Sequence, residues 1–392
     1  MTSLEGVLSA SNAEPAGHPA VAGQVVLVMQ GGGAQAAYQG GVYQALHEAN
    51  LEPDWVIGTS IGAINGSIIA GNKVASRLER LREFWSRIES RPTWPSGPMF
   101  GNAANQLSTL LTGVPGFFLP NAAFLWGPEA AVGVEHAAMY SVDPLRKLLP
   151  ELVDFDLVNS GKPRFTLGLV SVRSGQIRYF DSRDEKIGLD HVLGSSAVPP
   201  TFPAVRIDGE AYWDGGIYSN TPVEAVFDDY PRRSSVVFAV QIWHSRGVEP
   251  ESVAQVFARQ KDIMFGSRSR SHIAAQARLH RLRHVVRTLF DLLPEDKRNT
   301  PEVQELADYG CATTMHRSRS TQSRSTARLT PESTIFRRPR SMHAGRPDTW
   351  IRAASSRGGH GTIRLIRPSA SPCMRPTPTK TSYENRRASL AD

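Results

Sequence analysis

The chain has 392 residues, 40% of them hydrophobic, so it is long enough to bury a substantial core and to hold more than one domain. Two cysteines exclude a disulfide-stapled fold and fit a reducing compartment. The net charge of +7 is unevenly distributed, because residues 317–392 carry 16 of the 44 basic and four of the 37 acidic residues. That segment has a net charge of +12, which leaves −5 for residues 1–316. The body of the protein is therefore acidic.

Residues 1–23 are small and polar and are predicted to form a disordered leader. They have neither the basic start nor the apolar stretch of a secretory signal. No apolar run in the sequence reaches the ~18 residues that cross a bilayer. We therefore expect a cytoplasmic protein that is soluble or bound peripherally to membranes.

The first part of the folded region alternates between strands and helices. Short β-branched apolar runs, typical of buried parallel strands, occur at residues 24–30 and 55–57. Helical spacing follows each of them, at 38–50 and 61–70, and a third, amphipathic helix is predicted at 76–88. This alternation predicts an α/β fold with a mostly parallel sheet between helices.

Residues 91–133 interrupt the alternation. They are rich in Gly, Pro, Asn and aromatic residues and have little periodicity, which favours a lid or cap. Within this segment Phe117, Phe118 and Leu119 either face lipid or form a small separate core.

Further strands are predicted at residues 165–172, 176–180 and 236–243, followed by a long helix at 251–293. Part of that helix, 267–289, is basic and amphipathic. A solvated face is one interpretation of this pattern, and contact with anionic lipid headgroups is the other.

The amino-acid composition changes at Arg317. Arg, Ser, Thr and Pro dominate from there on, and neither helical nor strand periodicity is found. Two interpretations of residues 317–392 are open: a disordered basic tail, or the product of a reading-frame shift near His316. Out-of-frame translation of a GC-rich gene yields mostly Arg, Ser, Pro, Ala and Gly. A basic tail could bind nucleic acid without sequence preference, but no specific nucleic-acid partner is predicted.

The most informative motif is G-T-S-I-G at residues 58–62, between a predicted strand and a predicted helix. A serine with glycines two residues away on either side, on a strand-to-helix turn, is the nucleophile-elbow pattern. Gly58 and Gly62 are expected because the turn is sharp and neighbouring backbone comes close. Ser60 then stands at a helix N-terminus, where free N–H groups favour negative charge. The motif predicts a nucleophilic serine.

Three consecutive glycines, Gly31, Gly32 and Gly33, follow the first predicted strand and precede a helix. Their N–H groups are expected at the carboxyl edge of the sheet, where Ser60 also emerges and where open α/β sheets bind ligands. They are candidate donors to the oxyanion that forms when a serine attacks an ester. A dinucleotide-binding loop is the competing interpretation, but no acidic residue suitably placed for a ribose follows.

A serine nucleophile needs a base, and Asp214 is the main candidate. It follows an apolar triplet and precedes Gly215 and Gly216, which places the carboxylate on a tight loop with little bulk around it. An ordinary Asp-Gly turn is the simpler interpretation of this sequence. A histidine base is the alternative: the order serine, Asp214, His244 suits an α/β-hydrolase triad, and His191 is the other histidine to test.

Four motifs occur in this order: Gly31-Gly32-Gly33, Gly58-Thr59-Ser60-Ile61-Gly62, Ser195-Ser196-Ala197-Val198-Pro199 and Asp214-Gly215-Gly216. Together they resemble the patatin-like phospholipase family over roughly residues 24–245. The resemblance implies a three-layer α/β/α fold and a dyad, without histidine or calcium, in which Ser60 is the nucleophile and Asp214 the base. It also implies that the glycine-loop amides form the oxyanion hole. The family loop commonly continues with an Arg and a Gly, where this chain has Gln35 and Ala36.

We therefore expect a serine acyl hydrolase that cleaves phospholipid or related lipid esters through an acyl-enzyme and contacts a membrane surface. The alternative from another class is a lipid- or membrane-binding protein on the same fold without turnover. No Cys/His spacing suits a metal, and neither a metal nor another cofactor is predicted. Residues 24–245 are predicted to form the hydrolase domain, with 91–133 as its cap and 246–316 as a helical extension.

Overall fold

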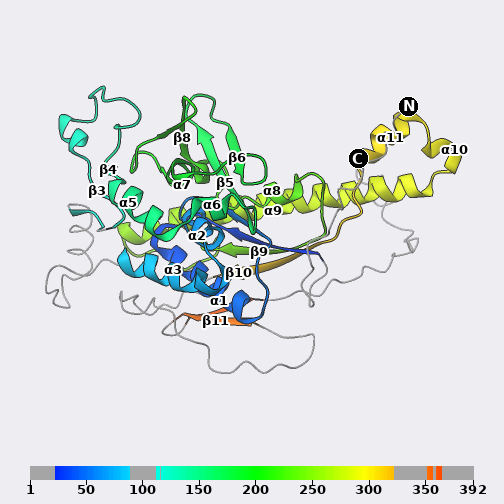
Figure 1. The fold of residues 1–392 in the computed structure, drawn as a ribbon, viewed down its shortest axis with the longest axis horizontal. Coiled ribbons are helices and arrows are strands. Elements are labelled where there is room, and N and C mark those ends of the chain that lie inside the picture. Colours follow the sequence, from blue (N-terminus) through cyan, green and yellow to red (C-terminus); the bar gives the residue numbers. More distant parts are fainter. Residues whose placement is uncertain (1–22, 89–111, 115, 322–350, 356–358, 364–392) are drawn as a thin grey trace, which may run out of the picture.

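The computed structural model describes residues 23–88, 112–114, 116–321, 351–355 and 359–363. Figure 1 shows how their helices and strands are arranged. Nearly all of the predicted leader, the first half of the predicted cap and most of the basic tail lie outside the described residues.

The N-terminal elements follow the predicted alternation of strands and helices: β1 (Gln24–Met29), η1 (Gly33–Ala36), α1 (Ala37–Glu48), β2 (Trp55–Gly58), α2 (Ile61–Ala70) and α3 (Val74–Arg87). The middle of the chain adds shorter elements: β3 (Leu119–Pro120), η2 (Ala122–Trp126), β4 (Tyr140–Ser141), α5 (Asp143–Leu152), α6 (Phe155–Val158), β5 (Arg164–Ser171), β6 (Ile177–Asp181), α7 (Leu189–Ser195), β7 (Val205–Ile207), β8 (Glu210–Asp214), η3 (Gly215–Ile217), α8 (Glu224–Phe227) and β9 (Ser235–Gln241). The C-terminal elements are α9 (Val253–Leu292), α10 (Glu295–Arg298), α11 (Pro301–Asp308), β10 (Met315–Thr321), β11 (Ile351–Ser355) and β12 (Gly359–Ile363).

Within the described residues, eight strands form one mixed sheet in the order β10-β9-β1-β2-β5-β8-β7, with β6 added to β5. The strands from β10 to β5 run parallel to their neighbours, whereas β6, β7 and β8 pair antiparallel. The predicted mostly parallel sheet is confirmed. The β7–β8 hairpin was not predicted, although its two-residue turn, Asp208-Gly209 with φ of 50° and 83°, has a typical hairpin sequence.

Each face of the sheet carries its own layer of helices. Along β1, Val25, Leu27 and Met29 point into the core formed with α1, α2, α3, α5 and α7. The intervening Val26 and Val28 point into the core formed with α8 and α9 on the other face. This period of two along a central strand gives the three-layer α/β/α fold.

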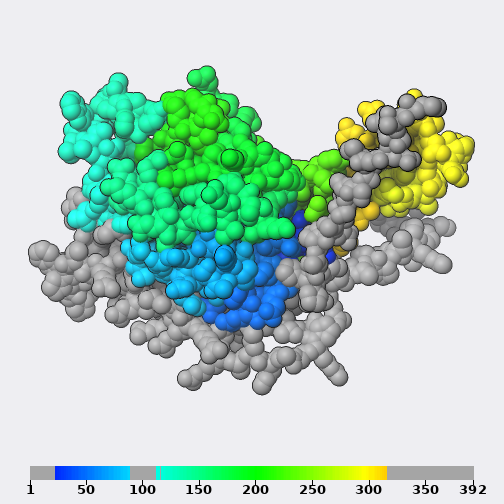
Figure 2. Space-filling model, in the orientation of Figure 1, coloured from blue at the N-terminus to red at the C-terminus, as the bar shows by residue number. Residues whose placement is uncertain are grey.

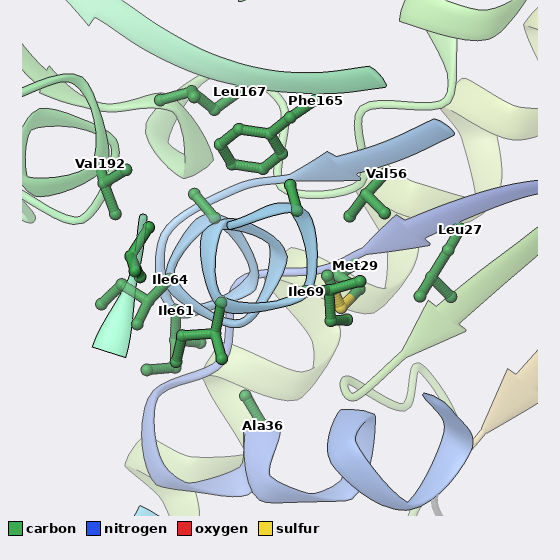
Figure 3. Close-up of a cluster of buried hydrophobic side chains, with 14 of the residues drawn as sticks. Leu27, Met29, Ala36, Val56, Ile61, Ile64, Ile69, Phe165, Leu167 and Val192 are labelled. Carbon is green, nitrogen blue, oxygen red and sulfur yellow. The ribbon is translucent and has the colours of Figure 1, made fainter. Parts of the chain in front are cut away.

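The first of these layers is centred on α2, whose ten residues are all buried. Figure 3 shows α2 end-on, surrounded by Met29 of β1, Val56 of β2 and Phe165 of β5. Small residues permit this close packing, since a Cβ on Gly66 would lie 2.7 Å from the Phe165 ring. Because α2 begins directly after Ser60, the packing fixes the helix N-terminus at that serine.

α9 covers the second face of the sheet and then continues beyond it. Its buried residues recur every three or four positions, at Asp262, Gly266, Ser269 and Ile273. The buried side chain of Gln30 ties α9 to the sheet: its Nε2 donates to Ser269 Oγ at 2.8 Å, and its Oε1 accepts the backbone N–H that follows β9 at 2.7 Å. The far half of α9, with α10 and α11 at its end, extends away from the body (Figure 1). No helix in the described parts of the chain is both long and apolar enough to cross a membrane.

The first residues of the tail, where the sequence shows no strand periodicity, lie in the strand β10. β10 pairs in parallel with all seven residues of β9, from Ser235 to Gln241. Such pairing uses the backbone groups of the sheet edge, which almost any sequence can supply, so a polar arginine-rich segment gives no strand signal. Further along, β11 and β12 form a two-stranded antiparallel sheet.

Candidate active site

Ser60 stands at the end of β2 in a strained backbone conformation. Its φ of 58° and ψ of −131° lie in a region that non-glycine residues rarely adopt. The chain turns here from strand to helix, since Gly58 ends β2 and Ile61 begins α2. This is the elbow geometry that the motif predicts, in which the turn presents the serine hydroxyl outside the strand and helix.

The two glycines of the elbow are required by close backbone approaches. A Cβ on Gly58 would overlap the carbonyl oxygen of Gly62. A Cβ on Gly62 would overlap the carbonyl oxygen of Met29, at the end of β1. The glycine spacing of the motif therefore reflects how the first turn of α2 fits against β1 and β2.

Asp214 lies at the end of β8, which runs antiparallel to β2 and brings the carboxylate to the elbow at Ser60. β2 pairs with the first half of β5 and β8 with its last three residues, while β6 pairs with parts of both stretches. β2 and β8 therefore share one edge of β5. Because β2 is parallel and β8 antiparallel to β5, their carboxyl ends meet, with Gly58 opposite Leu167 and Asp214 opposite Leu169.

Gly168, between those two positions, organises the junction. Its carbonyl oxygen accepts a hydrogen bond from Ser195 Oγ at 2.9 Å, and Ser195 Oγ accepts the Ser60 N–H at 3.3 Å. A Cβ on Gly215 would overlap the same carbonyl oxygen, so a glycine must follow Asp214. The sequence shows Ser195 only as part of a serine-containing motif, and the structure gives it a positioning contact with the elbow.

The carboxylate of Asp214 is buried, with 1% of the residue exposed. Its Oδ1 accepts the Gly216 N–H at 2.6 Å, and its Oδ2 has no hydrogen-bond partner among the described residues. Burial raises the pKa of Asp214 to about 7, and this effect outweighs the lowering by the nearby Ser60 hydroxyl and the Gly216 N–H. A carboxylate that is about half ionised near neutral pH is suited to act as a general base.

The three loop glycines differ in their surroundings. Gly31 is held in place: its N–H donates to the Asn220 carbonyl at 3.3 Å, and its carbonyl accepts from Asn220 Nδ2 at 3.0 Å and Trp243 Nε1 at 2.7 Å. The Gly31 N–H, predicted as an oxyanion donor, therefore already has a backbone acceptor. Gly32 and Gly33 stand at the start of η1, where N–H groups lack intrahelical acceptors, so these two remain the candidate donors. Neither Asn220 nor Trp243 was predicted, because nothing in the local sequence marks them.

These groups line a cavity of about 970 Å³ whose other walls are mostly apolar. Phe117 and Phe118 of the predicted cap and Phe202 belong to that wall. The Phe118 ring lies 4.7 Å from Tyr140 and 5.5 Å from Phe202 between centroids, and Phe117 joins this aromatic cluster to the main hydrophobic core, whereas Leu119 is exposed. Phe117 and Phe118 thus pack in this cluster and line the cavity. A volume of this size fits a drug-sized or acyl-chain ligand.

The structure does not assemble the alternative histidine triad. His244 is not among the residues that line the cavity, and its carbonyl accepts a hydrogen bond from Arg259 at 3.0 Å. The partnerless Oδ2 of Asp214 accepts from no histidine. His191 closes the start of α7, where its Nδ1 accepts the Gly188 N–H at 3.0 Å. In the described parts of the chain, no group of three or more His, Cys, Asp or Glu side chains is arranged to hold a metal ion.

Known protein families match two parts of the chain. Residues 27–227, about half of the chain, match the patatin-like phospholipase family. The chain belongs to the patatin-like phospholipase family. A second match, to a family described as patatin phospholipase, covers residues 263–325 and so includes most of α9 and all of β10. This second match continues past His316.

Individual relatives match the chain over shorter stretches. Patatin-like phospholipase domain-containing protein 6 of mouse and human is 40% identical over 90 residues, which is 21% of this chain and 7% and 6% of the two relatives. The match therefore spans only a small part of those proteins. Two solved structures are similar at a low level. VipD from Legionella pneumophila has a TM-score of 0.31 at 16% identity, over 79% of this chain and 63% of that chain. ExoU of Pseudomonas aeruginosa, in complex with SpcU, has a TM-score of 0.25 at 14% identity, over 65% and 52%.

Proposed function

We propose that this protein is a serine acyl hydrolase that cleaves phospholipid or related lipid esters through Ser60 and Asp214. One observation supports this most: a strained elbow serine and a buried carboxylate with a pKa of about 7 meet on the wall of a large apolar cavity. The family of the chain is consistent with lipid hydrolysis.

The proposed reaction has two halves. Ser60 Oγ attacks the ester carbonyl carbon while Asp214 takes the hydroxyl proton, and the oxyanion forms beside the N–H groups of Gly32 and Gly33. Collapse of the tetrahedral intermediate expels the alcohol, which receives the proton from Asp214, and leaves an acyl-enzyme. Asp214 then deprotonates a water that attacks the acyl-enzyme; as the ester bond to Ser60 breaks, Asp214 returns the proton to Ser60 Oγ and the fatty acid is released. Oδ2 is the oxygen available for these transfers, since Oδ1 already accepts the Gly216 N–H.

The charges of the cavity favour a phospholipid over a neutral ester as substrate. Arg82 of α3 and Lys261 of α9 both line the cavity, and Lys261 is exposed. Gln35 replaces the arginine that commonly follows the glycine loop in the family, and it does not line the cavity. We infer that Lys261 supplies positive charge for a phosphate headgroup from a different element of the fold.

A fluorophosphonate probe tests the proposal directly, because it reacts with an activated serine. We expect the probe to label the wild type at Ser60 and to leave Ser60→Ala unlabelled. We also expect Ser60→Ala to lose hydrolysis of p-nitrophenyl butyrate by at least about 10³-fold. The wild-type kcat/KM should rise with pH through about 7, as Asp214 ionises.

Retention of full activity in Ser60→Ala would refute the mechanism. Lipid binding by the wild type without labelling and without hydrolysis would instead favour the non-catalytic lipid-binding protein. Circular dichroism of both proteins provides the control for folding.

A further inference from the structure

The fold leaves three consecutive large apolar side chains in solvent at the tip of η2. Phe124 is 49% exposed, Leu125 87% and Trp126 81%. The surrounding residues 120–128 contain no charged side chain. Figures 1 and 2 show η2 within the cyan lobe that projects at the upper left of the body. Single exposed apolar residues are ordinary on protein surfaces, whereas a contiguous group of this kind marks an interaction site.

This exposure is built into the backbone. Asn121 caps η2, with its Oδ1 accepting the Ala123 N–H at 3.0 Å. Its Nδ2 donates to the carbonyl oxygens of His136 and Ala138, both at 2.8 Å, and so joins the two sides of the projecting segment. One amide side chain therefore holds the tip in a fixed turn that presents its apolar side chains outward.

Both ends of this segment reach the catalytic cavity. We call residues 117–140 the arm; at its start, Phe117 and Phe118 line the cavity. At its end, the N–H groups of Met139 and Tyr140 donate to the carbonyl oxygens of Pro200 and Thr201, both at 3.0 Å. Those carbonyls belong to the same loop as the cavity-lining residues 198, 201 and 202.

The rim of the cavity is also apolar and exposed. Val198 is 38% exposed, Ile217 43% and Met264 37%, and all three line the cavity. These residues come from the loop that holds the arm, from η3 and from α9. The cavity mouth thus carries exposed apolar side chains of its own, which suits contact with lipid.

We propose that the arm inserts Phe124, Leu125 and Trp126 into the surface of a lipid bilayer and so sets the cavity mouth against its substrate. This inference rests on the proposed function, because it takes the cavity to receive a lipid. Tryptophan prefers the boundary between headgroups and acyl chains, and an uncharged tip has no ion to dehydrate on insertion. Three side chains on a projecting turn are far too few for a stable protein interface, which buries roughly 1,200–2,000 Å².

Co-sedimentation of the full-length protein with phosphatidylcholine vesicles tests the inference. The variant is the double substitution Leu125→Ser with Trp126→Ser, and the matched control is Leu292→Ser, which removes a 75% exposed leucine at the far end of α9. We expect the vesicle partition coefficient to fall at least about tenfold in the double variant and to stay unchanged in the control. The ratio of the wild-type partition coefficient to that of the double variant should be the same at low and high salt, since the tip carries no charge.

Soluble p-nitrophenyl butyrate separates this inference from the proposed function. We expect the double variant to hydrolyse that ester like the wild type while it loses activity on vesicle lipid. The protein could bind vesicles through the tip and yet hydrolyse no ester. That result would refute the proposed function and support membrane insertion of the arm. Three results would refute insertion of the arm into a bilayer: no vesicle binding by the wild type, equal binding by the double variant, or an oligomer that dissociates when the tip is changed.

Discussion

Ionisation of Asp214 is expected to destabilise the folded protein, and Asp214→Asn should reveal this. The pKa of Asp214 is raised by burial from 3.8 to about 7, so the native state holds the proton more tightly than the unfolded chain. The free energy of unfolding therefore falls as pH rises from about 4 to about 7 and then levels off. Asparagine resembles the protonated carboxyl in shape and charge, and it does not titrate.

The expected change in the free energy of unfolding follows from the pKa shift of Asp214. A change from 3.8 to about 7 at 1.36 kcal/mol per unit corresponds to on the order of 4 kcal/mol. Near pH 4 the ionisation of Asp214 should contribute little to the difference in unfolding free energy between the variant and the wild type. Above pH 8 the variant should be the more stable protein by up to that amount, although it should lose about 10²- to 10⁴-fold in ester hydrolysis.

Urea denaturation followed by circular dichroism at pH 5 to 9 measures this difference. Asp208→Asn is the matched control, because Asp208 is exposed in the β7–β8 turn and asparagine tolerates its φ of 50°. The control should follow the wild type at every pH. If the stability gap between Asp214→Asn and the wild type stayed constant across this range, the reasoning from burial would be refuted.

Two further substitutions test other parts of the site. Gly62→Ala should destabilise the protein by at least about 3 kcal/mol or prevent folding, because its Cβ would overlap the Met29 carbonyl, whereas Gly41→Ala on α1 meets open space and should stabilise it by about 1 kcal/mol. Thermal melts compare the two alanines, and equal effects would contradict the packing argument. Lys261→Met should raise the KM for a phospholipid about tenfold and leave p-nitrophenyl butyrate hydrolysis unchanged. Equal changes on both substrates would argue against headgroup recognition by Lys261.

The sequence predicts the first half of the fold well because parallel strands buried on both faces read as continuous apolar runs. The strands at β1 and β2 and the helices that follow them lie where those runs and the helical spacing place them. The elbow was predictable for a similar reason: Gly58 and Gly62 are dictated by backbone contacts that recur wherever this turn is built.

Other parts of the site gave no local signal. Asn220 and Trp243 act on Gly31 from loops distant in the chain, and only the assembled sheet brings them together. β10 depends on backbone pairing at a sheet edge, which its polar side chains do not reveal. The apolar tip of the arm was hidden in a segment whose aromatic residues suit a cap, a core and a surface equally well.

β2 and β8 meet end to end along β5, so the length of β5 cannot change without displacing Asp214 from Ser60. The length of the arm is not restricted in this way. Inserting one residue in β5 would shift Asp214 relative to Ser60 and turn side chains to the opposite face of the sheet. The arm instead enters and leaves between α3 and α5, outside this junction. Its length and tip could therefore be exchanged without changing the strand register that brings Asp214 to Ser60.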